Sequence, residues 1–127
     1  MSIKNSPPTS PVIIKAERII VNVFDVDKMV KFYSDVLGLV VMVDDRKNGW
    51  VVFSAGSIEI ALHDMPALRQ AEWMPKIVFS VLSIKDAWNY FKENNIVIGE
   101  MADITGSMAF DITDPEGNDY QFIEKRF

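Results

Sequence analysis

Histidine, the commonest metal ligand among side chains, occurs only once in this chain of 127 residues. Cysteine does not occur, which excludes disulfides, a thiolate zinc site and a cysteine nucleophile. The sequence also contains no glycine-rich phosphate loop and no serine nucleophile elbow. What remains is a group of charged and polar side chains set into short apolar segments, namely Arg18, Asn22, Glu59, His63, Lys76, Ser80 and Gln121. Their chemistry is ion pairing, hydrogen bonding or, for Glu59, Gln121 and the single histidine, metal ligation.

The segments that carry these residues have the period of β-strands and occur as a repeat. Arg18 to Val23 reads RIIVNV, with apolar residues alternating along it. Lys76 to Val81 reads KIVFSV, with apolar residues in the same places 58 residues later. The spacing therefore predicts two equivalent strands.

Each of these strands leads directly into an amphipathic helix. The first helix has Asp25 as its expected N-cap and Gly38 as its stop, because glycine enters the left-handed region at no steric cost. The second has Ser83 as its expected N-cap and ends at Asn94-Asn95. At the offset of 58, cap matches cap and Phe32-Tyr33 matches Tyr90-Phe91.

Three short strands are predicted after each helix, so that the chain reads βαβββ twice. They are Leu39 to Val43, Trp50 to Ala55 and Ser57 to Leu62 in the first copy, and Val97 to Met101, Ser107 to Ile112 and Asp119 to Glu124 in the second. One such unit buries too little surface by itself, so the two should pair. We expect an arm at 1–15 and one α+β domain at 16–127, made of units 16–64 and 75–127.

Two motifs resemble those of a known family. The stretch DVDKMVKFYSDVLGL at Asp25 to Leu39 is similar to the capped helix with Phe-Tyr and a closing V-L-G in the vicinal-oxygen-chelate superfamily (glyoxalase, bleomycin resistance protein, extradiol dioxygenase). Asp114 to Asn118, DPEGN, resembles the family's closing turn. The resemblance covers residues 17–125 and implies a U-shaped, mixed-sheet cleft with helices on the outside.

The resemblance also implies four positions where metal-using members keep their ligands. Counted from the matched motifs, these are Arg18, Glu59, Lys76 and Gln121. Lysine and arginine have no lone pair to offer a metal at neutral pH, so we expect neither a metal nor another cofactor. A site of His63, Glu59 and Gln121 stays open as an alternative.

The polar residues should share one face of the strands, with Trp50 placed to line the same cleft. One interpretation is an internal ion pair, in which Glu59 lies between Arg18 and Lys76. The other is a ligand site, because two cations and one anion leave a surplus positive charge suited to a carboxylate, phosphate or enolate.

These considerations predict a metal-free member of the family that binds a small, anionic organic molecule in its cleft as a homodimer. The alternatives are a metal-dependent lyase or dioxygenase, a metal-free isomerase or lyase, and a module without a ligand. A net charge of −5 argues against nucleic acid as a partner. No apolar run approaches the roughly 20 residues of a membrane span, and Met1 to Pro11 does not resemble a signal peptide. The absence of cysteine fits a cytoplasmic protein, which is the location that we expect.

Overall fold

The computed structural model describes residues 11–65, 75–104 and 106–125. Most of the expected arm and much of the connection between the units lie outside the described residues. No helix in the described ranges is long and apolar enough to cross a membrane.

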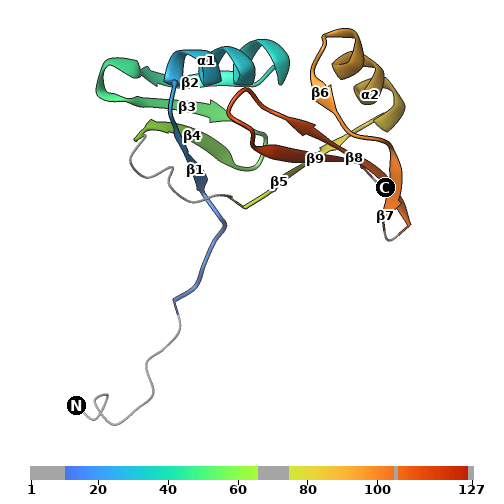
Figure 1. The fold of residues 1–127 in the computed structure, drawn as a ribbon. Helices are drawn as coiled ribbons and strands as arrows, with labels where there is room; N and C mark the ends of the chain where they lie inside the picture. The colour runs from blue at the N-terminus through green and yellow to red at the C-terminus, as the bar shows by residue number, and fades with distance from the viewer. Residues whose placement is uncertain (1–10, 66–74, 105, 126–127) are drawn as a thin grey trace, which may run out of the picture.

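The first unit follows the expected order of strand, helix and three strands (Figure 1). Its elements are β1 (Arg18–Val23), α1 (Val26–Lys31), the π-helical turn η2 (Phe32–Val36), β2 (Val40–Asp45), the 3₁₀ turn η3 (Arg46–Asn48), β3 (Trp50–Ser54) and β4 (Glu59–Asp64). Both caps of the helical segment are confirmed. The Asp25 carboxylate accepts a hydrogen bond from the Lys28 backbone N–H at 3.0 Å, and Gly38 has φ of 72° after the last helical turn.

The second unit repeats this order with one strand divided. Its elements are β5 (Ile77–Val81), α2 (Ile84–Glu93), β6 (Val97–Ile98), β7 (Ala102–Ile104), β8 (Ser107–Thr113) and β9 (Asp119–Glu124). The Ser83 hydroxyl accepts from the Asp86 backbone N–H at 3.2 Å, which confirms the predicted cap.

The expectation of one strand from Val97 to Met101 is wrong, because β6 ends at Ile98 and the next strand begins only at Ala102. The Gly99 backbone N–H makes one last hydrogen bond to β8, to the Asp111 carbonyl at 2.9 Å. The backbone carbonyl of Gly99 accepts a hydrogen bond from the Trp88 indole at 3.1 Å, which holds the strand end against α2. Pairing resumes in β7, and both β6 and β7 lie against β8.

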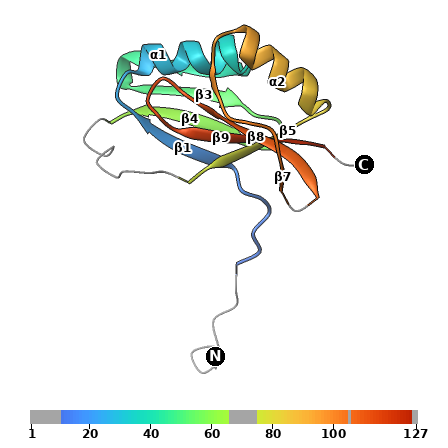
Figure 2. The same ribbon diagram turned by 45° about the vertical axis from the view of Figure 1, so that its right-hand side comes forward.

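The two sheets have the same topology. Their orders are β1-β4-β3-β2 and β5-β9-β8-β6, with β7 also on β8. In each sheet the first strand runs parallel to the last strand of its unit, and the other pairs are antiparallel. Figures 1 and 2 show both helices on the same side of the sheets. The sequence repeat is therefore a structural repeat, and the α+β prediction of two βαβββ units is confirmed.

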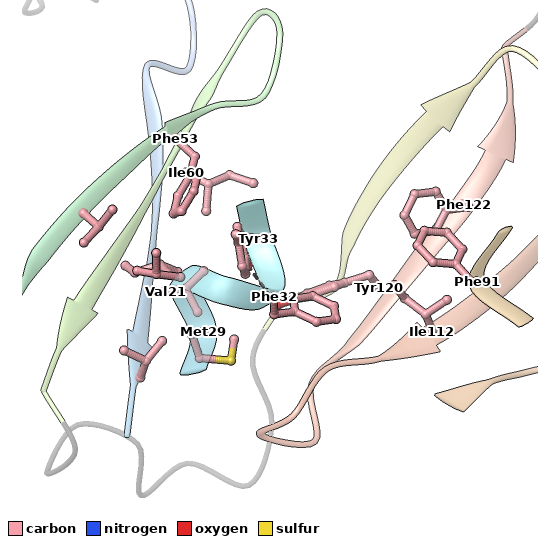
Figure 3. Packing of buried hydrophobic residues seen from close by; sticks show 14 of the residues in the cluster. Val21, Met29, Phe32, Tyr33, Phe53, Ile60, Phe91, Ile112, Tyr120 and Phe122 are labelled. Atoms are coloured by element: carbon pink, nitrogen blue, oxygen red, sulfur yellow. Dashed lines mark hydrogen bonds between the residues drawn. The ribbon is translucent and has the colours of Figure 1, made fainter. Parts of the chain in front are cut away.

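The two units meet on the helix side, through aromatic side chains (Figure 3). Phe32 and Tyr33 on η2 pack against Tyr120 on β9, with ring centroids 6.0 and 6.1 Å away. The hydroxyls of Tyr33 and Tyr120 are hydrogen bonded at 2.8 Å, and that of Tyr120 donates to the buried Asp114 carboxylate at 2.6 Å. Burial in this apolar setting raises the pKa of both phenols, so both stay neutral.

A second polar contact joins the units at the start of α1. The Glu116 carboxylate, in the DPEGN turn of the second unit, accepts from the backbone N–H groups of Phe24 at 2.9 Å and Asp25 at 2.8 Å. Backbone N–H groups at a helix N-terminus favour a negative charge, so this contact stabilises α1 as well as the junction.

Candidate functional site

Arg18 and Glu59 form an ion pair at the start of the first sheet. They are register partners on the parallel strands β1 and β4. The guanidinium Nε and Nη2 donate to the same carboxylate oxygen at 3.0 and 2.6 Å. Both side chains keep about a third of their surface exposed, at 39% and 30%, so the pair faces solvent on the side of the sheet away from α1.

Trp50 and His63 lie further along the same face. They are register partners on β3 and β4, and their rings meet edge to face at a centroid distance of 5.4 Å. The Arg18 guanidinium lies 5.8 Å from the Trp50 ring centroid, so these two long side chains lean toward each other. Ala61, between Glu59 and His63 on β4, is fully buried although it faces away from the core helix.

The first sheet thus presents a row of functional groups from carboxylate to guanidinium, indole and imidazole. Asn22 pairs in register with His63 and is half-buried beside it. All five residues predicted from the first unit, Arg18, Asn22, Trp50, Glu59 and His63, are therefore brought to one face.

The expectation that Glu59 lies between Arg18 and Lys76 is wrong. The Lys76 ammonium donates instead to the carboxylate of Asp111 on β8, at 2.7 Å. Within the described ranges, no ion pair joins Lys76 to Glu59. Each sheet neutralises its own cation, and Asp111 cancels the surplus positive charge that favoured an anionic ligand.

Asp111 was not predicted as a site residue, although the alternation of residues along its strand indicates the face on which it lies. Ser107, Ala109, Asp111 and Thr113 alternate with the buried Phe110 and Ile112, which places the carboxylate on the open face. Gln121 is paired in register with both Val78 and Asp111, so it lies in the row between β5 and β8. Ser80 is on the same face, opposite Ile123.

The contact with Asp111 also bears on catalysis by Lys76. The hydrogen bond from the ammonium to this carboxylate raises the pKa of Lys76. A lysine that acts as a base or forms a Schiff base needs a lowered pKa. Lys76 is therefore suited to holding a position or a ligand rather than to proton abstraction.

The residues present do not fit a catalytic metal ion. In the parts of the chain that the structure describes, no three His, Asp or Glu side chains gather around a common point. His63 and Glu59 are four residues apart on β4, a separation of about 13 Å between Cα atoms at the usual strand rise. Gln121 lies on β9 of the second sheet. The spacing of Glu59 and His63 along β4 already keeps these two side chains from sharing one ion with it.

A small hollow borders the ion pair in the first unit. It has a volume of about 130 Å³ and is lined by Lys15, Glu17, Met42, Ser54, Gly56, Ser57, Ile58 and Glu59. Its lining is mixed polar and apolar, and it opens beside the Glu59 carboxylate. A volume of this size accommodates a few heavy atoms, such as one ring or side group of a larger molecule.

Two repeated βαβββ units with polar residues on the outer sheet faces define the class of fold. The family model described as "Glyoxalase/Bleomycin resistance protein/Dioxygenase superfamily" matches residues 15–122. The chain belongs to this superfamily, as the two sequence motifs predicted.

Known proteins extend this likeness. The chain is 28% identical over 104 residues to "Metallothiol transferase FosB" of Staphylococcus haemolyticus, which covers 76% of this chain and 73% of the relative. Among solved structures, TnmS3, "an antibiotic binding protein from Streptomyces sp. CB03234", matches with a TM-score of 0.80 at 15% identity, over 92% of this chain and all of that one. A lactoylglutathione lyase from Agrobacterium tumefaciens matches with a TM-score of 0.69 at 20% identity, over 93% and 96% of the two chains. At these identities the structural matches show the fold alone.

Proposed function

We propose that this chain binds a small organic molecule on the open face of its sheets without the help of a catalytic metal. The observation that carries the proposal is the chemistry at the four family ligand positions. Arg18 and Lys76 occupy two of them, and each is held by a carboxylate of its own sheet at 2.6 or 2.7 Å. A metal ion would have to compete with a paired cation at both places.

The favoured ligand is neutral or weakly charged and contains an aromatic ring. An anionic group would have to displace Glu59 from Arg18 or Asp111 from Lys76, because both cations are already paired. The half-buried Trp50 offers a ring for stacking, and Asn22, Ser80 and Gln121 offer neutral hydrogen-bonding groups.

A metal-dependent enzyme is the second candidate, and one observation favours it. The relative at 28% identity is a metallothiol transferase. Metal analysis of protein purified without chelator separates the two proposals. We expect no stoichiometric nickel, zinc, iron or manganese, and no gain in thermal stability when these ions are added. One bound ion per chain, lost in Glu59→Gln, would sink the metal-free proposal.

Binding itself is tested by tryptophan fluorescence with neutral aromatic fragments and bleomycin as probes. We expect at least one probe to quench the emission, and expect the quenching to disappear in Trp50→Phe. Trp88→Phe is the matched control, since Trp88 lies on α2 with its indole bonded to Gly99. Quenching by none of the neutral aromatic fragments, or quenching that persists in Trp50→Phe, would contradict the proposal.

We further propose that the protein acts as a cytoplasmic homodimer and does not bind nucleic acid. The absence of cysteine supports the cytoplasmic location, and the net charge of −5 supports the statement that the protein does not bind nucleic acid.

A further inference from the structure

The open face of the first sheet has an apolar row between two rows that carry polar side chains. This row, which we call the middle row, crosses the four strands in register and consists of Ile20, Ala61, Val52 and Val43. Val52 and Ala61 are only 2% and 0% exposed. They are not part of the buried cluster on the helix side, which takes the alternate positions of the same strands. A second set of buried apolar side chains therefore lies on the open face.

Arg18 and Trp50 approach the middle row from its two sides. Arg18 is in register with Glu59 on one side of the row, and Trp50 is in register with His63 on the other. The Cα atoms of Glu59 and His63 are about 13 Å apart at the usual strand rise, whereas the Arg18 guanidinium lies 5.8 Å from the Trp50 ring centroid. The arginine and tryptophan side chains therefore lean toward each other across the row and shield its buried centre.

The gap between the Arg18 guanidinium and the Trp50 indole is slightly too narrow for an aromatic ring. A ring in contact with both groups requires about 7 Å between them, which is twice the van der Waals separation of about 3.5 Å. The separation in the structure is 5.8 Å. Arg18 is a long, flexible side chain that is 39% exposed, so it can supply the missing distance of roughly 1 Å without disturbing the core.

We propose, on the basis of the function proposed above, that an electron-rich aromatic ring enters between Arg18 and Trp50 and lies on the middle row. The face of an aromatic ring carries negative charge, which attracts a guanidinium held over it. A ring rich in electrons is therefore bound more tightly than an electron-poor ring of the same shape. Arg18 determines this specificity, and Glu59 holds the guanidinium in place through hydrogen bonds of 3.0 and 2.6 Å.

The Glu59 carboxylate adds a second requirement for the ligand. Both Arg18 donors go to its Oε1 atom, and no donor from the described part of the chain is bonded to Oε2. The Glu59 side chain is 30% exposed, so a ligand can reach this second oxygen. A carboxylate oxygen accepts hydrogen bonds only, and it therefore favours an O–H or N–H group on the ligand. The ligand class is a neutral, electron-rich aromatic compound with such a donor, such as a phenol or an indole.

The ring preference is tested with anisole and pentafluoroanisole, which have the same shape and opposite charge on the ring face. Dissociation constants are measured by NMR titration. We expect the wild-type protein to bind anisole about fivefold more tightly, and expect Arg18→Met to reduce this preference to less than about twofold. Fluorination makes the ring more hydrophobic, so burial of apolar surface alone predicts the opposite order. Arg46→Met is the matched control, because Arg46 is an ion-paired arginine of similar exposure, 38%, that contacts Asp27 on α1.

The donor preference is tested with p-cresol, an isomer of anisole that carries a hydroxyl. We expect p-cresol to bind about tenfold more tightly than anisole, and expect Glu59→Met to abolish this advantage. Equal binding of p-cresol and anisole would overturn the role of Glu59.

The outcomes for the ring are distinct from a failure of the proposed function. Equal or tighter binding of pentafluoroanisole, or a preference for anisole that persists in Arg18→Met, would overturn the role of Arg18 while leaving small-molecule binding intact. Absence of binding for all three compounds would contradict the proposed function as well.

Discussion

Replacement of Tyr120 by phenylalanine removes one hydroxyl from the buried junction of the two units. This hydroxyl donates to the Asp114 carboxylate at 2.6 Å and is bonded to the Tyr33 hydroxyl at 2.8 Å. A hydrogen bond to a charged group contributes about 1.5–3 kcal/mol, and a buried hydroxyl left without a partner costs about 1–3 kcal/mol. We therefore expect Tyr120→Phe to lower the free energy of unfolding by about 4 kcal/mol.

Tyr33→Phe removes the other end of the same hydrogen bond with a smaller effect. Tyr120 keeps Asp114 as its acceptor, so only one neutral hydrogen bond is lost, at a cost of about 1 kcal/mol. In the double variant no unpartnered phenol remains. We expect it to be about 1 kcal/mol more stable than Tyr120→Phe alone, which makes the two changes strongly non-additive.

Urea unfolding followed by circular dichroism measures all three free energies. Tyr90→Phe is the control, because the Tyr90 hydroxyl also crosses between the units, to the Val36 carbonyl at 2.8 Å, but is exposed. It should cost less than 1 kcal/mol, near the low end for a hydrogen bond in contact with water. Equal losses in Tyr33→Phe and Tyr120→Phe, or losses that add in the double variant, would refute the directional hydrogen-bond chain from Tyr33 to Tyr120 to Asp114.

Three other outcomes follow from the same structure. The free energy of unfolding should fall as pH rises above 10, the ordinary pKa of tyrosine, because Tyr33 and Tyr120 bind their protons more tightly in the folded state than in the unfolded state. Urea titrations from neutral to alkaline pH should show a shallower decline of this free energy in the double phenylalanine variant. Glu116→Ala should lower the free energy of unfolding by about 1–2 kcal/mol, because the start of α1 loses its acceptor, and an unchanged urea midpoint would contradict this. Arg18→Met and Lys76→Met should each cost at most about 1 kcal/mol, because exposed ion pairs stabilise weakly; loss of folding in either variant would instead show that the pair is structural.

The fold was predictable because its signals are local. The strand period around Val21 and Phe79, the caps at Asp25 and Ser83, and the stop at Gly38 each depend on a few neighbouring residues. Because these features recur 58 residues apart, they predicted the repeat. The division of the strand after Ile98 was not predictable in this way, because it depends on the Trp88 indole, which comes from α2 and satisfies the Gly99 carbonyl.

The sequence predicted which site residues share a face of the sheet, but it did not predict the ion-pair partner of every one of them. Alternation along β1 and β4 correctly placed Arg18 and Glu59 on one face, and they are register partners. One of the two interpretations placed Lys76 beside Glu59, yet Lys76 pairs with Asp111 two strands away, across β9. A contact of this kind depends on strand order and on the reach of a long side chain, and neither is a property of a local pattern.

The positions of these two ion pairs, each within one sheet, indicate that other contacts hold the two units together. Arg18 and Lys76 are each paired with a carboxylate of their own sheet. In the described part of the chain, contacts between the units lie on the helix side, where Tyr33 meets Tyr120 and Glu116 meets the start of α1. Residues on the open face are thus free to serve a ligand without supporting the junction. Substitutions there should change ligand binding with little effect on unfolding, whereas substitutions at the tyrosine junction should do the reverse.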